Sequence, residues 1–255
     1  MRSMKRSFAE IKTAPSFFFM FMAVDLVIIF FFFVFTKRSS GYPASLFCLC
    51  DYVEHLCSSN LFRTVFIPTA IVCIYLMSES PQTSNAIIRF NSKTQLTTIQ
   101  FIKAFLLSLC FSFFTILSSI GLGFLFTKTI YNWDSQHSLF FLSHQYCIFV
   151  SFPTVLLWAT YRVFIWLILF SSILIVLWRI IRRSYCFMVL FALIICNLFD
   201  MVSYYASLII GQNTTSPLYI SLSDRATYFI VFPFVILILI ILSFKLAKKK
   251  EYMIP

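Results

Sequence analysis

A short polar stretch, residues 48–57, gathers side chains of the kinds that bind metals or form disulfides. It contains Cys48, Cys50, His55 and Cys57. Zinc sites use cysteine thiolates and histidine nitrogens, usually in pairs spaced as C-x-x-C or H-x-x-x-H, and neither spacing occurs in this stretch. In an oxidising lumen the Cys-x-Cys pair would serve a disulfide equally well. A metal site, a disulfide and simple packing at the start of a helix all stay open; we prefer packing and predict no metal or other cofactor.

An acid inside an apolar run is the second feature that could do chemistry. Asp25 lies in the middle of the run 16–36. An unpaired charge in the bilayer costs about 2.5–3.5 kcal/mol on insertion scales, so such a residue usually has a partner. Arg63, just inside the next apolar run, is the obvious one, because consecutive spans are antiparallel neighbours. We therefore predict an intramembrane Asp25–Arg63 pair.

Asp51 and Asp200 are two further acids, to which we assign contacts with a partner or with the core. On a helix, Asp51 would share one face with Glu54 and His55. Asp200 lies inside the apolar run 185–210 and has no obvious basic partner in the sequence. If the protein were a transporter or channel, Asp25 and Asp200 would line its path.

Catalytic motifs are missing from the sequence. No serine lies in a G-x-S-x-G nucleophile elbow. No glycine is followed by lysine, which excludes the phosphate-binding motif G-x-x-x-x-G-K-[ST]. The three histidines do not fall at ligand spacing with one another. We predict a protein that is not an enzyme and has no catalytic residues.

Seven apolar runs must position these residues. They cover 16–36, 61–77, 101–126, 138–160, 163–178, 185–210 and 228–247. A helix that spans the hydrocarbon core needs about 20 apolar residues. The chain is 60% apolar and 11% charged, whereas a soluble domain is about 45–50% apolar and 25% charged. The sequence therefore predicts an all-α polytopic bundle of transmembrane helices.

The distribution of Lys and Arg decides between seven spans and six. The net charge of +11 does not indicate nucleic acid, because these residues lie between the runs and at both ends. Seven spans place ten basic residues inside and nine outside, which carries no orientation signal. If 163–178 is instead an interfacial or re-entrant helix on the cytoplasmic side, fifteen lie inside and four outside. The four are Lys37, Arg38, Lys128 and Arg225. Six spans with both termini cytoplasmic are thus favoured, and seven stay open.

A single glycosylation sequon agrees with this orientation. It is Asn213-Thr214-Thr215, in the connection 211–227. Both topologies place that connection outside the cytoplasm, where Asn213 would be a glycosylation site. The sequon supports the orientation without choosing between six and seven spans.

Three positions carry a resemblance to a known family. Phe21-Met22-Ala23-Val24-Asp25, Asp51 and Leu61-Phe62-Arg63 resemble the amino-terminal accessory transmembrane domain of TAP-like ABC half-transporters, the lysosomal peptide transporters. The family has a four-helix domain with an Asp in helix one and an acid about a dozen positions before an Arg at the start of helix two. The resemblance implies that Asp25 pairs with Arg63 and that the domain directs its transporter to lysosomes and recruits membrane partners there.

The resemblance covers roughly residues 10–160, where Val155-Leu156-Leu157-Trp158 also looks like the end of the family's fourth span. Beyond residue 160 it fades, and the nucleotide-binding domain is missing, so no ATPase activity is implied. We divide the chain into an accessory-like domain at 1–160, an interfacial helix and basic connection at 161–184, and a helical hairpin with a basic tail at 185–255.

The preferred hypothesis is a non-catalytic membrane module in the endolysosomal membrane. Its partners would be the lipid bilayer and other transmembrane helices, either a transporter core or an endolysosomal membrane protein. Two alternatives stay open: a seven-pass serpentine receptor of the G-protein-coupled chemoreceptor type, which would favour the plasma membrane, and a small transporter or channel subunit working as a homo-oligomer.

Overall fold

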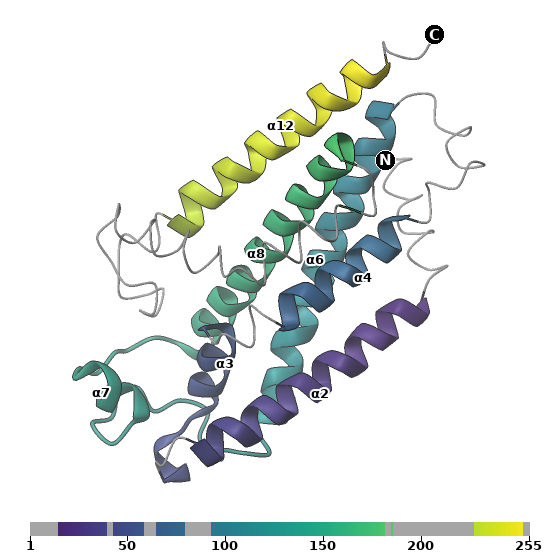
Figure 1. Ribbon diagram of the computed structural model, residues 1–255. Coiled ribbons are helices and arrows are strands. Elements are labelled where there is room, and N and C mark those ends of the chain that lie inside the picture. Colours follow the sequence, from purple (N-terminus) through teal and green to yellow (C-terminus); the bar gives the residue numbers. More distant parts are fainter. Residues whose placement is uncertain are drawn as a thin grey trace. The chain divides into compact units, whose positions relative to one another are not determined.

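The computed structural model describes residues 15–39, 43–58, 65–79, 93–181, 185 and 227–251. Every regular element in these ranges is helical (Figure 1). The longer helices are α2 (Pro15–Ser39), α4 (Ile67–Glu79), α6 (Lys93–Gly123), α8 (Phe152–Ile180) and α12 (Phe232–Glu251). The shorter elements are η1 (Ala44–Leu46), α3 (Leu49–Ser58), α7 (Leu139–His144) and the π-helical turn η4 (Thr227–Val231).

Four of the described helices are long and apolar enough to cross a membrane. The candidate spans are Phe19–Arg38, Thr94–Gly123, Phe152–Ile180 and Tyr228–Lys248, and Ile67–Met77 is a shorter apolar helix. These helices confirm the prediction of an all-helical polytopic membrane protein. The number six stays a prediction, because the run 185–210 lies outside the described residues and the run 61–77 is described only in part.

The predicted division between 138–160 and 163–178 is wrong. Helix α8 runs without a break from Phe152 to Ile180, through Tyr161 and Arg162. Neither of those two residues breaks a helix, so hydropathy alone placed the boundary there. An interfacial helix beginning near residue 161 is therefore excluded, and Val155–Trp158 belongs to the first turns of a span instead of its end.

Residues 138–151 form no part of a span, although their composition is apolar. The Ser138 hydroxyl accepts a hydrogen bond from the Phe141 N–H and caps the six-residue helix α7. Gln145 then ends α7 in the left-handed conformation, with φ of 61°. These local signals convert the apolar stretch into a loop, which leads into α8.

The chain divides into two compact units. The first unit contains Met1–Phe21, Ile67–Leu109 and Ile165–Pro255, and the second unit contains Met22–Phe66 and Cys110–Phe164. The second unit contains α3, α7 and parts of α2, α6 and α8. Residues 43–48 lead into α3, and residues 124–151 connect α6 to α8. The candidate site lies in this unit.

An aromatic core holds the second unit together. The Phe33 ring lies 4.8 Å from Tyr52 and 5.9 Å from Phe126, measured between ring centroids. Gly123, the last residue of α6, meets the start of α3, because a Cβ at this position would overlap the Leu49 side chain. Glycine thus lets the two helix ends approach without displacing the Leu49 side chain. The remaining buried members of the core are Ile29, Phe32, Phe47 and Leu56.

Candidate functional site

Asp51 occupies the first turn of α3, and both of its carboxylate oxygens accept hydrogen bonds. The Cys48 backbone N–H donates to Oδ2 at 2.8 Å, and the Trp133 indole N–H donates to Oδ1 at 2.6 Å. The first amides of a helix have no partner within the helix, and an acid there is also favoured by the helix dipole. Asp51 therefore caps α3 and ties it to a residue 82 positions further along the chain.

The segment around Thr129 satisfies the other polar groups at the start of α3. The Leu49 N–H donates to the Thr129 carbonyl at 2.9 Å, and the Cys50 N–H donates to the Ile130 carbonyl at 3.4 Å. In return, the hydroxyls of Thr127 and Thr129 each donate to the Phe47 carbonyl at 3.0 Å. Residues 46–51 are thus bound along their length to residues 127–133. We call residues 43–58 together with 124–151 the cap.

Trp133 organises the second half of the cap. Its side chain is buried and stacks on Phe140, with ring centroids 4.9 Å apart. Its carbonyl accepts from the Ile148 N–H at 3.0 Å. The Tyr131 hydroxyl donates to the Ile148 carbonyl at 2.5 Å and accepts from the Val150 N–H at 2.9 Å. The hydrogen bonds of Trp133 and Tyr131 therefore fix the conformation of the loop between α6 and α8.

An ion pair between a buried arginine and a partly buried glutamate joins the cap to α8. Arg162 Nη1 lies 2.9 Å from Glu54 Oε1, and the exposed fraction is 4% for the arginine side chain and 20% for the glutamate side chain. Arg162 is ten residues into the span that begins at Phe152, which corresponds to about 15 Å along the helix axis. A cation at that depth is costly without a counter-charge, and Glu54 supplies one.

Burial changes the chemistry of the titratable groups in the cap. It raises the pKa of Asp51, against the opposing effect of the Cys48 and Trp133 hydrogen bonds. It raises the pKa of the Cys57 thiol to about 12, although the Arg162 guanidinium favours the thiolate. It also raises the pKa of Cys48, with a further contribution from its contact with Cys50. The thiols of Cys48 and Cys57 are therefore weak nucleophiles and weak metal ligands at neutral pH.

A second buried acid lies within the span of α2. Asp25 is 1% exposed, and its Oδ2 lies 3.1 Å from the Thr115 hydroxyl on α6. The same hydroxyl donates to the Phe111 carbonyl at 2.9 Å. Ser112 and Ser119 are buried on the same helix. Asp25 Oδ1 has no hydrogen-bond partner among the residues that the structure describes.

The predicted site residues in and around α3 differ in their exposure and in their contacts. Cys48, Cys50 and Cys57 are buried free thiols, and His55 is exposed, 6.1 Å from the Phe32 ring. Among the described residues, no group of three His, Cys, Asp or Glu side chains could hold a metal ion. The expected shared face separates into different roles, because Asp51 bonds Trp133 and Glu54 bonds Arg162.

Three predicted site residues, Arg63, Asp200 and Asn213, lie outside the described residues. The Asp25–Arg63 pair, the contact of Asp200 and glycosylation of Asn213 therefore stay predictions.

Sequence reasoning missed Arg162, Trp133 and Thr115. Arg162 carried a usable signal, because it is a lone charge inside a 29-residue apolar helix. The predicted boundary between the runs 138–160 and 163–178 placed Arg162 in a connection, where a charge is ordinary. Trp133 and Thr115 carried none, because a tryptophan in a polar loop and a threonine in a span have many ordinary uses. Comparison with known protein families, with curated proteins and with solved structures finds no match.

Proposed function

We propose that this protein is a non-catalytic membrane module that acts through contacts of its helices with other membrane helices. The observation that carries the proposal is the low burial of α12 within the chain. Only 6% of its span is buried within the chain, compared with 61% of the span of α8. Its outward side chains include Phe234, Ile238 and Ile241, between 46% and 61% exposed. Such a helix offers apolar surface to lipid and to partner helices.

The buried polar groups support a scaffolding role. Asp51 and Glu54 bond to Trp133 and Arg162, and Asp25 bonds to Thr115. Each of these contacts joins segments that are far apart in the sequence. The buried acids of the second unit thus serve to hold the helices together.

The proposed partners are a transporter core or an endolysosomal membrane protein, as the resemblance to TAP-like accessory domains implies. One local feature supports that resemblance. Asp25 faces the protein interior, and one of its oxygens is not satisfied by any described residue. Arg63 lies four positions before α4 and would provide the cationic donor that this oxygen needs.

The proposed topology keeps both termini in the cytoplasm. With α8 as one span, Arg162 lies within the membrane, as does Lys103, which is ten residues into α6, so thirteen basic residues are inside and four are outside. The bias that favours this orientation is therefore preserved. The cap lies on the exoplasmic side, at the ends of α2, α6 and α8 that face away from the cytoplasm. A seven-pass receptor predicts the opposite location for the N-terminus.

A photo-crosslinking experiment tests the proposal. A photoreactive amino acid is placed at Ile238, which is 46% exposed, and at Ile236, which is 8% exposed, as the matched control on the same helix. The full chain is expressed in cells and irradiated in endolysosomal membranes. We expect one discrete membrane-protein adduct from position 238 and at least a fivefold weaker one from position 236. Lipid adducts alone at position 238 would contradict the proposal.

Two further measurements test the orientation and the pair. An N-terminal tag should be accessible only from the cytoplasm, and an exoplasmic tag would instead favour the receptor. Asp25→Ala and Arg63→Ala should each reduce localisation to endolysosomes, and the charge-swapped double variant should partly restore it. A double variant as impaired as the single ones would argue against the pair.

A further inference from the structure

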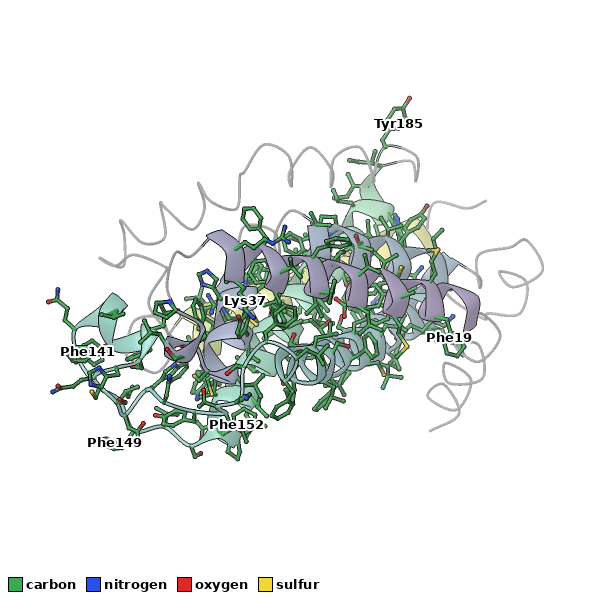
Figure 2. The ribbon with its side chains drawn as sticks, turned by 90° about the horizontal axis from the view of Figure 1, so that it is seen from below. Phe19, Lys37, Phe141, Phe149, Phe152 and Tyr185 are labelled. Atoms are coloured by element: carbon green, nitrogen blue, oxygen red, sulfur yellow. The ribbon has the colours of Figure 1, made fainter. Side chains whose placement is uncertain are left out.

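Phe149 is the most exposed large apolar side chain in the cap. It is 84% exposed and lies between α7 and α8, at the outer edge of the loop in Figure 2. An isolated exposed apolar residue is ordinary on a protein surface. This one is different because the backbone on both sides of it is fastened, and because of where the loop is attached.

The Tyr131 hydroxyl fixes the backbone on both sides of Phe149, and with it the direction of the Cα–Cβ bond. It donates to the carbonyl of residue 148 and accepts from the N–H of residue 150, and the Ile148 N–H is held by the Trp133 carbonyl. Reversing the Cα–Cβ bond of Phe149 would require the backbone at residues 148–150 to turn and would break at least one of these bonds. The ring is thus presented outward, which costs free energy in water unless something apolar receives it.

The attachment of the loop indicates what receives it. Helix α8 has 29 residues, a length of about 43 Å, which matches a bilayer with its headgroup layers at about 40–45 Å. The helix therefore begins in the headgroup layer. Phe149 precedes its first residue by three positions, a reach of at most about 11 Å.

A second apolar side chain occupies the equivalent place at the other end of the loop. Leu125 is 71% exposed and follows the last residue of α6 by two positions, a reach of about 7 Å. Leu142 of α7 is 48% exposed. The apolar surface of the cap is therefore continuous along the chain with the two candidate spans that flank it.

We propose that Phe149 and Leu125 anchor the cap in the interfacial layer of the bilayer. The occupant of this surface is lipid, at the boundary between headgroups and acyl chains, where amphipathic and aromatic side chains gather in membrane proteins. The anchor holds the outer part of the cap, the loop 124–151, at the exoplasmic surface of the membrane. This inference depends on α6 and α8 spanning the bilayer and not on the identity of any protein partner.

Site-specific fluorescence in nanodiscs tests the anchor. An environment-sensitive fluorescent amino acid replaces Phe149 in the full chain, and in a second protein it replaces Gln136, an exposed polar residue of the same loop. The nanodiscs contain phosphatidylcholine, brominated either near the headgroup or deep in the acyl chain. We expect at least threefold stronger quenching at position 149 than at position 136, and stronger quenching by the shallow bromine than by the deep one.

The outcomes separate lipid from other occupants. Equal, weak quenching at positions 149 and 136 would overturn the proposal. A blue-shifted but unquenched probe at position 149 would also overturn it, because the ring would then lie against protein, such as a second copy of the chain. A probe at Leu125 gives an independent arm. In a Phe149→Ser background, whose elution and melting in detergent should be unchanged, its quenching should fall at least twofold; unchanged quenching would contradict a joint anchor.

Discussion

Two arginines on α8, one buried and one partly buried, have different partners. Arg162, in the second unit, faces a carboxylate, Glu54, at 2.9 Å. Arg179, in the first unit, donates to neutral oxygens, the Thr97 hydroxyl and the Gln100 amide carbonyl, both at 2.7 Å. Arg162 lies ten residues inside the helix, whereas Arg179 is the residue before its last. The same side chain on the same helix thus contacts a carboxylate at one position and a hydroxyl and an amide at the other.

Depth in the membrane explains the difference. Near the end of a helix, the C-terminal dipole and access to water both stabilise a cation, so the insertion cost that its partners must offset is smaller. Deep in the span neither is available, and the insertion cost has to be offset by an opposite charge. That charge comes from α3, a helix of ten residues outside the candidate spans. The cap is therefore required for α8 to carry Arg162.

The largest expected effect comes from breaking the pair at its acidic member. Glu54→Gln leaves the Arg162 charge buried without its counter-ion, which should cost about 3–5 kcal/mol of stability. We expect little monodisperse protein in mild detergent, measured by fluorescence-detected size-exclusion chromatography with heating. The double variant Glu54→Leu and Arg162→Leu removes both charges and should recover most of the stability. A single variant that melts like the unaltered protein would contradict the role of the pair.

The next largest loss of stability is expected when Asp51, which accepts two hydrogen bonds within the cap, is replaced. Asp51→Ala leaves the Cys48 N–H and the Trp133 indole N–H buried without an acceptor, at a cost of about 2–4 kcal/mol for the two groups. Hydrogen exchange should become faster in α3 and around residue 133, and much less in α12. Uniform acceleration across all described helices would mean that the cap is not a local unit.

Asp51 should also give the cap a dependence on pH. Burial raises its pKa above the ordinary 3.8, so the folded state binds this proton more tightly than the unfolded chain does. The contribution of Asp51 to stability is therefore greatest below pH 3.8 and falls as the pH rises through the raised pKa. Melting temperatures measured from pH 4 upward should show the decline, and Asp51→Asn should remove it. The opposite slope would show that the two hydrogen bonds outweigh burial.

Arg179→Met tests the contribution of the second arginine. It removes the two hydrogen bonds that the charged donor makes to Thr97 and Gln100, each of a kind worth about 1.5–3 kcal/mol, and both of these acceptors are neutral. The loss should be smaller than that of Glu54→Gln in the same melting assay. If Arg179→Met were the more harmful of the two, depth in the membrane would not account for the choice of partner.

The smallest expected effect is at Thr115. Thr115→Val removes the hydroxyl that contacts Asp25, and interhelical hydrogen bonds in membranes average about 0.6 kcal/mol with a maximum of about 1.7. Thr160→Val is the matched control, because the Thr160 hydroxyl bonds only to the Leu156 carbonyl of its own helix. A shift in melting temperature at position 115 no larger than at position 160 would show that the contact with Asp25 does not stabilise the protein.

The apolar runs predicted from the sequence correspond to helices where a run is uniform. The runs 16–36 and 228–247 match the spans Phe19–Arg38 and Tyr228–Lys248 closely. The run 138–160 fails because hydropathy sums composition and ignores local bonds. The Ser138 cap and the left-handed Gln145 divide it, and Tyr131 and Trp133 then hold the first part as a loop. More than half of the predicted span thus belongs to the cap.

Composition and the lengths of the apolar runs determined by themselves that this is a polytopic helical membrane protein, and the cost of a charge in hydrocarbon indicated that Asp25 would have a partner. The tertiary structure alone decided which groups meet. Glu54 and Arg162 are 108 positions apart, and Asp51 and Trp133 are 82 apart. The physical reason is that hydrophobicity is a property of a segment and can be read locally, whereas a hydrogen bond or ion pair depends on two segments arriving in register.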